Sequence, residues 1–266
     1  MKSLEELSSL KGRIALITGA GGHIGAAISD GLAELGADLI LLDRDAGTCG
    51  ETAKGIREKY GVRTSCLQVD LERLDEYDIL REVRAITQKL DILVNCAAFV
   101  GTDKLEGWNE QFERQSAATW RRAIEVNLTA PFVLIQSLLP LLSESKHASV
   151  INFSSIYGIC APDYSVYEEL DMNNPAAYAA SKAGLLQLTR WLATTLAPNI
   201  RVNAVTPGGV ARGQPEIFIE RYEAKTPLRR MASEEDMKGA VAYLASDLSR
   251  YVTGQNIVVD GGWSVW

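Results

Sequence analysis

The sequence predicts an α/β fold in which a doubly wound parallel sheet is covered by helices on both faces. Two observations support this prediction. Short apolar runs alternate along the chain with longer segments of helical character. The apolar runs are also nearly continuous, as expected for strands that are buried on both faces. Alternating strands and helices of this kind build parallel sheets, because each helix carries the chain back to start the next strand.

Each element is bounded by the length and composition of its segment. The predicted strands are Ile14–Thr18, Asp38–Leu42, Ile92–Asn95, Val150–Phe153, Arg201–Val205 and Asn256–Val259. The predicted helices are Gly25–Leu35, Thr48–Tyr60, Asp75–Lys89, Thr119–Leu142, Ala176–Leu196 and Ser233–Ala245. Ser3 and Glu6 have the spacing of a capping box, which predicts a short leading helix. No repeat or linker interrupts the alternation, so residues 1–266 are expected to form a single domain.

Composition excludes several classes of partner. The chain has 266 residues, of which 47% are hydrophobic, and a formal net charge of −7 without a strongly basic stretch. Nucleic acid and anionic membrane surfaces are therefore not expected as partners. The four cysteines are widely spaced and there are only two histidines, so no metal site is expected. Reduced thiols are the default for a cytoplasmic protein, which is the expected location.

Targeting and membrane segments are not expected either. Residues Met1 to Leu10 are too polar for a secretory signal. The longest apolar stretch, Pro131 to Leu142, is interrupted by Gln136 and Ser137 and is too short to span a bilayer.

A glycine-rich turn, Thr18 to Gly25, connects the first predicted strand to the first helix. Glycines there let backbone N–H groups approach a pyrophosphate at the helix N-terminus, as in a Rossmann-like sheet. A tight turn without a ligand is the alternative interpretation. The candidate cofactor-binding residues of this turn are Gly19, Gly22, His23, Ile24 and Gly25.

Asp43 follows the second strand and lies eighteen residues beyond Gly25. A carboxylate at about this distance binds the ribose hydroxyls of the adenosine, and it would repel a 2′-phosphate. NAD is therefore favoured over NADP as the cofactor. Arg44 leaves NADP open, because a nearby arginine can accommodate the phosphate. The alternative for Asp43 is a helix or turn cap.

Tyr178 and Lys182 are four residues apart in a predicted helix, which places them on one face. A free tyrosine has a pKa of about 10 and is a poor base at neutral pH. A neighbouring ammonium favours the phenolate and is expected to lower that pKa. Such a tyrosine can exchange a proton with an alcohol or a ketone. The spacing also occurs by chance, so its weight depends on the rest of the chain.

With these residues placed, the chain resembles the compact branch of the short-chain dehydrogenase/reductase family along nearly its whole length. The resemblance rests on landmarks that occur in the family's order. They are Thr18–Gly25, Asp70 with Leu71, Asn95–Ala98, Asn127, Ser154–Gly158, Tyr178 with Lys182, Pro207 with Gly208, and Asp260–Gly262.

The resemblance implies a catalytic set. Tyr178 would be the general acid/base, and Lys182 would hold the nicotinamide ribose and lower the pKa of Tyr178. Ser155 would bind the substrate oxygen, and its position three residues before Gly158 favours it over Ser154. Asn127 would position a water in a proton relay. Taken singly, Ser155 could be a strand-end cap and Asn127 a core amide. The resemblance also implies cofactor contacts for Asp70, Leu71, Asn95, Ala97, Tyr178, Lys182, Pro207 and Gly208; Asp70 could instead be a turn residue.

The chain departs from the family pattern at three places. His23 stands where compact members usually have glycine, and could contact the cofactor or face solvent. The stretch Asn95 to Ala98 lacks the usual second asparagine and final glycine, and Cys96 within it is interpreted as a small buried hydrophobe. The gap from Ser155 to Tyr178 is about ten residues longer than in compact members.

Two enlarged loops, residues 99–118 and 159–177, are expected at the carboxyl ends of strands, where such sheets bind ligands. Their aromatic, amide and carboxylate side chains suit a polyhydroxylated substrate. Both loops resemble those of family members from bacterial surface-sugar and flagellin-modification pathways. A subunit contact or a solvated loop is the alternative. The candidate substrate residues in and beside these loops are Trp108, Tyr157, Tyr164 and Tyr167.

The resulting hypothesis is an NAD-dependent oxidoreductase that interconverts a secondary alcohol and a ketone, on a sugar or sugar derivative. Residues 209–231 would form a mobile lid over this small-molecule substrate. The alternatives are a reductase of an acyl-carrier-linked or steroid carbonyl and a nucleotide-sensing protein without turnover. The family usually forms homotetramers or homodimers, and the apolar stripes of Thr119–Leu142 and Ala176–Leu196 suit such an interface.

Overall fold

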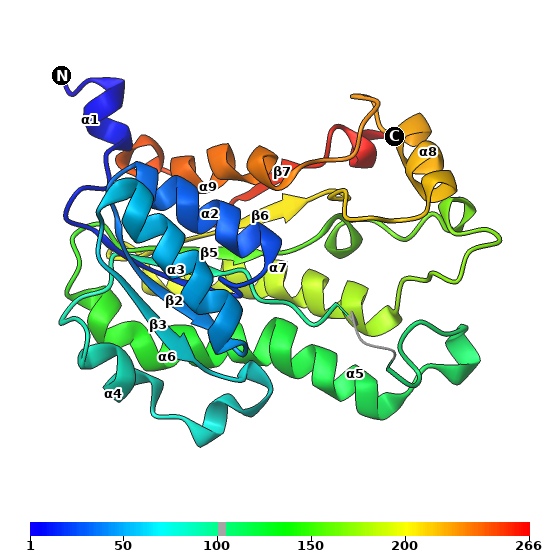
Figure 1. Ribbon diagram of the computed structural model, residues 1–266, viewed down its shortest axis with the longest axis horizontal. Helices are drawn as coiled ribbons and strands as arrows, with labels where there is room; N and C mark the ends of the chain where they lie inside the picture. The colour runs from blue at the N-terminus through cyan, green and yellow to red at the C-terminus, as the bar shows by residue number, and fades with distance from the viewer. Residues whose placement is uncertain (101–104) are drawn as a thin grey trace.

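The computed structural model describes residues 1–100 and 105–266, and it contains a seven-stranded parallel sheet between two layers of helices (Figure 1). The strand order is β3-β2-β1-β4-β5-β6-β7. The strands are β1 (Ile14–Thr18), β2 (Asp38–Asp43), β3 (Thr64–Gln68), β4 (Ile92–Asn95), β5 (Ser149–Phe153), β6 (Arg201–Pro207) and β7 (Asn256–Val259). The predicted fold class and all six predicted strands are confirmed, whereas β3 was not predicted.

Alternating strand residues feed two separate hydrophobic cores. In β1, Ala15 and Ile17 pack in the core under helices α2 (His23–Glu34), α3 (Ala46–Tyr60) and α9 (Lys238–Ala245). Leu16, between them, packs on the opposite face with α4 (Ile79–Arg84), α6 (Ala130–Ser143) and α7 (Ala176–Leu196). Burial on both faces explains why the strands are continuous apolar runs.

The remaining elements include one confirmed helix and two corrections. Helix α1 (Leu4–Ser8) has the predicted capping box between Ser3 and Glu6. The predicted helix Asp75–Lys89 is wrong, because a 3₁₀ helix, η1 (Leu71–Glu76), and the short α4 replace it. The predicted helix Ser233–Ala245 starts as a 3₁₀ turn, η6 (Glu234–Met237), before α9. The other elements are η2 (Phe112–Arg114), α5 (Ala117–Ile124), the π-helical turn η3 (Glu125–Thr129), η4 (Ile156–Gly158), η5 (Tyr164–Val166), α8 (Glu216–Lys225), η7 (Asp247–Ser249) and η8 (Trp263–Val265).

Helices α5 and α6 join through η3 into one helical segment, Ala117–Ser143. By length and composition alone this 27-residue segment could cross a membrane, so the length argument made for Pro131 to Leu142 is wrong. Its apolar residues nevertheless have a partner inside the protein. Leu134 and Leu138, for example, are fully buried in the core formed with β4, β5 and β6.

The strand order reverses between β1 and β4, which are paired up to their last residues, Thr18 and Asn95. The chain leaves β1 towards β2 on one side, whereas β4 continues the sheet on the other side. The hydroxyl of Thr18 holds the segment after β4 by accepting hydrogen bonds from the N–H groups of Cys96 and Ala97, both at 3.1 Å. A crevice at such a reversal is where open α/β sheets bind their ligands.

Candidate active site

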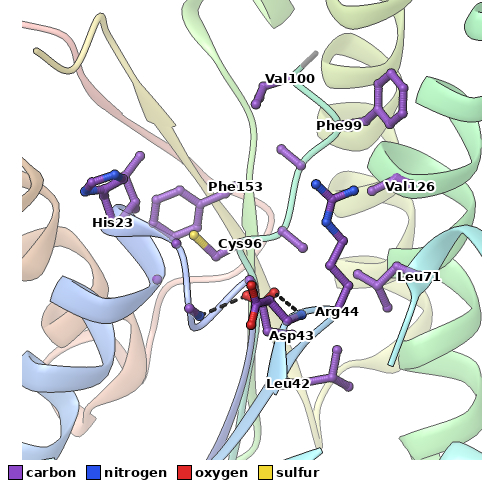
Figure 2. Close-up of a pocket in the computed structure, with 18 of the residues that line it drawn as sticks. His23, Leu42, Asp43, Arg44, Leu71, Cys96, Phe99, Val100, Val126 and Phe153 are labelled. Carbon is purple, nitrogen blue, oxygen red and sulfur yellow. Dashed lines mark hydrogen bonds between the residues drawn. The ribbon is translucent and has the colours of Figure 1, made fainter. Parts of the chain in front are cut away.

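A cleft of about 460 Å³ opens at this edge of the sheet. Its walls come from the glycine-rich turn, the ends of β2 and β4, and helix α7, and Figure 2 shows Asp43 between His23 on one side and Arg44 on the other. Most of the predicted site residues line it. They are Gly19, Gly22, His23, Ile24, Gly25, Asp43, Arg44, Asp70, Leu71, Ala97, Tyr178, Lys182 and Pro207.

The glycine-rich turn is built for close approach. A Cβ on Gly25 would lie 2.0 Å from the carbonyl oxygen of Gly19, so only glycine lets α2 start this close to the turn. Gly19 has a positive φ of 70°, and a Cβ there would lie 2.8 Å from the Cα of Ala97. Gly22 is the N-cap of α2 and supplies no side-chain hydrogen bond to the first turn. The turn therefore fits a diphosphate, which can accept hydrogen bonds from the backbone N–H groups at the N-terminus of α2.

Asp43 holds a defined orientation at the end of β2. Its Oδ2 accepts a 2.9 Å hydrogen bond from the N–H of Gly21, and its Oδ1 accepts one of 3.1 Å from the N–H of Asp45. The predicted turn-capping role is therefore present, and the carboxylate also lines the cleft. Arg44 is exposed, and Figure 2 shows its side chain beside Leu71 and Val126.

Two other predicted cofactor residues lie at the margins of the cleft. Asp70 caps η1, because its Oδ1 accepts a 3.0 Å hydrogen bond from the N–H of Glu72, and it lines the cleft together with Leu71. His23 is the first residue of α2, and its side chain is 72% exposed. Its ring therefore lies at the rim, with Nδ1 3.9 Å from Oε1 of Glu234.

Lys182 is almost completely buried, with 2% of its surface exposed. Its Nζ donates a 2.7 Å hydrogen bond to the carbonyl oxygen of Phe153 and lies 5.8 Å from the centre of the Tyr178 ring. Burial lowers the pKa of Lys182 to about 8, an effect that the neighbouring Cys96 partly opposes. The predicted side-by-side arrangement of Tyr178 and Lys182 is confirmed.

The predicted direction of the Tyr178 pKa shift is wrong for the protein's own groups. Burial raises the pKa of Tyr178, while a hydrogen bond with Ser155 and the charge of Arg212 lower it by less. The physical reason is that the phenolate is poorly solvated, whereas the Lys182 ammonium is directed to Phe153. Lys182 thus holds its charge near the phenol without overcoming the cost of burying a phenolate.

The two adjacent serines have different hydrogen-bond partners. Ser155 hydrogen-bonds Tyr178, and its Oγ also accepts a 3.2 Å hydrogen bond from the N–H of Tyr157, which caps η4. Ser154 instead donates from Oγ to the carbonyl oxygen of Lys182 at 2.9 Å. Ser155 is thus the serine that is paired with the candidate proton carrier, whereas Ser154 is the one that lines the cleft, and the preference for Ser155 stays a prediction.

Asn127 lies in the π-helical turn between α5 and α6 and is fully buried. Its Oδ1 accepts a 2.6 Å hydrogen bond from the N–H of Phe99, and its Nδ2 donates at 3.0 Å to the hydroxyl of Ser181. The residue therefore ties the loop after β4 to the helix of Tyr178. Single π-helical turns often occur at functional sites. Its predicted role in positioning a water stays a prediction.

Two predicted cofactor residues do not line the cleft. The side chain of Asn95 is buried in the sheet, where its Nδ2 donates a 2.8 Å hydrogen bond to Oδ1 of Asn152. Gly208 packs against the backbone of Asp260, so closely that a Cβ would lie 2.8 Å from its Cα. Both residues support the strand ends beside the cleft, and their predicted contacts with the cofactor stay predictions.

Trp108 also differs from the prediction. It is 4% exposed, and it packs in a small cluster with Phe99 and Tyr178. Its Nε1 donates a 3.2 Å hydrogen bond to the carbonyl oxygen of Val100. The indole is therefore the internal support of its loop and does not form an exposed aromatic surface. Residues 101–104 of this enlarged loop lie outside the described residues.

Tyrosines of the second enlarged loop contact one another. The hydroxyls of Tyr157 and Tyr167 share a short hydrogen bond, and burial raises the pKa of both phenols. Tyr164 is 55% exposed and lies beside Tyr167, with ring centres 6.3 Å apart. The pair of hydroxyls, rather than Tyr164, forms the polar part of this aromatic group.

The predicted lid contains a helix, α8, that rests on the second enlarged loop. Ring centres of Tyr167 and Phe218 are 5.5 Å apart, and those of Tyr222 and Trp263 are 4.2 Å apart in a stacked arrangement. Lys225 forms an ion pair with Asp163. The segment therefore has a packed position over the carboxyl end of the sheet. Its predicted mobility stays a prediction.

Hydrogen bonds join the two enlarged loops to each other. The Nδ2 of Asn109 donates to the carbonyl oxygen of Asp171 at 3.0 Å, and that of Asn173 donates to the carbonyl oxygen of Glu110 at 2.9 Å. The loops therefore form one unit before the N-terminus of α7.

Arg212 lines the cleft but was not predicted. It follows the landmark Pro207 with Gly208, in a segment that sequence reasoning treated only as a lid. The sequence signal that could have identified Arg212 was a single basic residue shortly after the end of a predicted strand. Cys96 also lines the cleft, and burial raises its pKa to about 12, which agrees with its interpretation as a small buried hydrophobe. Among the side chains that the structure describes, no cluster of three or more potential ligands could hold a metal ion.

Comparison with known proteins gives consistent relatives. Residues 19–264 match the protein-family model described as enoyl-(acyl carrier protein) reductase. A 3-oxoacyl-[acyl-carrier-protein] reductase of Aquifex aeolicus is 34% identical over 95% of this chain and 98% of its own length.

Solved structures share the whole fold. A gluconate 5-dehydrogenase of Beutenbergia cavernae, described as putative and NAD(P) dependent and containing NADP at low occupancy, is 32% identical with a TM-score of 0.86. The alignment covers 98% of this chain and 100% of that one. A short chain dehydrogenase of Leptospira borgpetersenii with bound NAD+ is 32% identical with a TM-score of 0.82, over 99% of this chain and 96% of that one.

Proposed function

Because the chain belongs to the short-chain dehydrogenase/reductase family of oxidoreductases, we propose that it interconverts a secondary alcohol and a ketone with NAD as the cofactor. The observation that carries the proposal is Tyr178 on the wall of the cleft, with a hydrogen bond to Ser155 and the buried ammonium of Lys182 beside its ring. A proton carrier with a hydrogen-bonding hydroxyl and a buried cation beside it is what this chemistry requires.

Each side chain has a defined task in the proposed reaction. Tyr178 exchanges a proton with the substrate oxygen, and Ser155 hydrogen-bonds both Tyr178 and that oxygen. Lys182 holds a positive charge near the phenol and favours the phenolate over the level set by burial alone. The nicotinamide, when bound, accepts or supplies the hydride and adds a second positive charge in its oxidised form.

The preference for NAD is supported by Asp43. Its carboxylate is held by two backbone N–H groups on the wall of the cleft, so it cannot easily turn away from an incoming ribose. A 2′-phosphate would face this charge at close range. Arg44 lines the same wall and supports the alternative cofactor, NADP, which one of the related structures contains.

A sugar or sugar derivative is the proposed substrate. The proposal is supported by the paired hydroxyls of Tyr157 and Tyr167, the second of which is close enough to Tyr178 to feel its charge, and by the amide-rich contact between the enlarged loops. The related Beutenbergia cavernae structure, described as a gluconate 5-dehydrogenase, agrees with a substrate of this class.

The second candidate is reduction of an acyl-carrier-linked ketone. It is favoured by the apolar side chains of Phe99, Val100 and Leu105 on the cleft wall and by the reductase among the relatives. A cofactor-sensing protein without turnover is disfavoured, because sensing does not need a proton carrier.

We further propose a homotetramer or homodimer in the cytoplasm. Helices α5, α6 and α7 carry the exposed side chains of Trp120, Phe132 and Trp191, and covering such side chains is a common reason for assembly. The four cysteines are free thiols, which supports a reducing compartment.

The test is a screen for NADH formation across sugar alcohols, sugar acids, nucleotide sugars and simple secondary alcohols, beside reduction of a short 3-oxoacyl thioester. Tyr178→Phe is the control for each active compound. We expect sugar-type turnover that Tyr178→Phe reduces by about 100-fold or more while NADH binding persists. Turnover of the thioester alone would favour the second candidate. Cofactor binding without any Tyr178-dependent turnover would reject the enzyme.

A further inference from the structure

Arg212 has a position that the proposed reaction does not yet use. It lies five residues after Pro207 and lines the cleft. Its Nε is 3.4 Å from Oε1 of Glu234, and the same oxygen lies 3.9 Å from Nδ1 of His23. Because His23 is the first residue of α2, these contacts place the guanidinium close to the N-terminus of that helix.

Arg212 lines the same cleft as Tyr178 and Cys96. Its positive charge acts on Tyr178 and Cys96, and it partly offsets the rise in the pKa of both groups that burial causes. The guanidinium therefore stands between the glycine-rich turn and the proton carrier. A dinucleotide that spans these two regions would carry its diphosphate past this side chain.

We propose that Arg212 binds the diphosphate of the dinucleotide cofactor, and that Glu234 holds the guanidinium until the cofactor takes its place. This inference rests on the proposed cofactor. Arginine suits the role because its planar fork matches phosphate oxygens. The uncapped N-terminus of α2 adds partial positive charge on the other side of the same anion.

The ion pair with Glu234 is suited to exchange. The side chains of Arg212 and Glu234 are 35% and 28% exposed, so solvent screens their attraction. The backbone around Arg212 is held separately. Its N–H donates a 2.6 Å hydrogen bond to Oε1 of Gln214, whose Nε2 donates to the carbonyl oxygen of Val210 at 2.9 Å. Exchange therefore needs a rotation of two side chains and no movement of the segment.

The test compares two ligands that differ in the diphosphate. ADP-ribose and adenosine are titrated into the full-length protein by calorimetry, with wild type, Arg212→Gln, Arg212→Lys and Glu234→Gln. We expect Arg212→Gln to bind ADP-ribose about 10-fold more weakly and adenosine as wild type does. Arg212→Lys should bind ADP-ribose with an affinity between those of wild type and Arg212→Gln. Glu234→Gln should bind ADP-ribose a few-fold more tightly than wild type does.

Arg230→Gln is the matched control. Arg230 is a nearby arginine of the same segment that pairs through two hydrogen bonds with Asp236, away from the cofactor cleft. The Arg230→Gln variant should bind ADP-ribose as wild type does.

Two results would overturn the inference. In the first, Arg212→Gln binds ADP-ribose like wild type. In the second, it loses both ligands equally, which indicates general damage. Wild-type protein that binds no ADP-ribose would instead reject the cofactor proposal itself.

Discussion

The ammonium of Lys182 donates a hydrogen bond of 2.7 Å to the main-chain carbonyl of Phe153, the last residue of β5. The position of the charge is therefore set by the sheet as well as by the helix that carries it. A main-chain acceptor cannot be altered by changing the side chain of Phe153. The charge is also costly, because water reaches almost none of the lysine.

Lys182→Met is expected to stabilise the fold at neutral pH. The folded pKa of about 8 lies below the ordinary lysine value of 10.5, so between these values the unfolded chain binds more protons. The free energy of unfolding therefore rises with pH between about 8 and 10.5. Below that range the full cost of burying the charged lysine is present, about 3 kcal/mol. Urea unfolding at pH 7 should favour Lys182→Met by about 1 to 3 kcal/mol, and the difference should shrink by pH 10. An equal difference at both pH values would argue against a titrating lysine.

Ser155→Ala and Ser154→Ala are expected to separate chemistry from stability. Loss of the Ser155 hydroxyl removes the hydrogen bond to Tyr178, and kcat should fall about 100-fold. Loss of the Ser154 hydroxyl leaves the carbonyl of Lys182 without that donor, which should cost about 1 kcal/mol of stability and leave kcat within a few-fold. Steady-state kinetics and thermal unfolding measure the two effects. The opposite pattern would assign the reaction to Ser154.

Asp43→Asn is expected to weaken the choice of NAD over NADP. The amide keeps an acceptor for the N–H of Gly21 but removes the charge that repels a 2′-phosphate. The ratio of kcat/KM for NAD to that for NADP should fall by about 10-fold or more. Asp45→Asn is the control, because Asp45 caps α3 and asparagine caps as well. An unchanged ratio in Asp43→Asn would transfer cofactor choice to another residue.

Gly25→Ala is expected to abolish cofactor binding. Its Cβ would lie 2.0 Å from the carbonyl oxygen of Gly19, so the turn or the helix must move. Gly55→Ala, in the interior of α3, meets nothing within 4 Å and should stabilise the protein by about 0.5 to 1 kcal/mol. Fluorescence titration with NADH and thermal unfolding check the pair. Normal NADH binding by Gly25→Ala would show that the close approach is dispensable.

The sequence predicted the central sheet well because burial on both faces leaves a simple signal. Strand β3 was missed because it lies at the edge of the sheet, where Thr64, Ser65 and Gln68 are at least partly exposed and interrupt the apolar pattern. Helix α8 was missed although Pro215 precedes it and Lys225 lies in its last turn. Its apolar contacts are to aromatic residues distant in the chain, which periodicity does not reveal.

The site was predictable where spacing along one helix decides it, as for Tyr178 and Lys182. It was not predictable where tertiary packing decides it. The direction of the Tyr178 pKa shift depends on how much water reaches the phenol, and that depends on elements distant in the chain. The pairing of Arg212 with Glu234 likewise joins residues that no local pattern connects.

The hydrogen bonds between Asn109 and Asp171 and between Asn173 and Glu110 make the two enlarged loops interdependent. A chimaera that receives only one of these loops from a relative with another substrate would lose donors or acceptors on the loop that remains. The two segments are therefore best exchanged between relatives as a cassette, and gradual divergence by changes in one loop would be constrained by its partner.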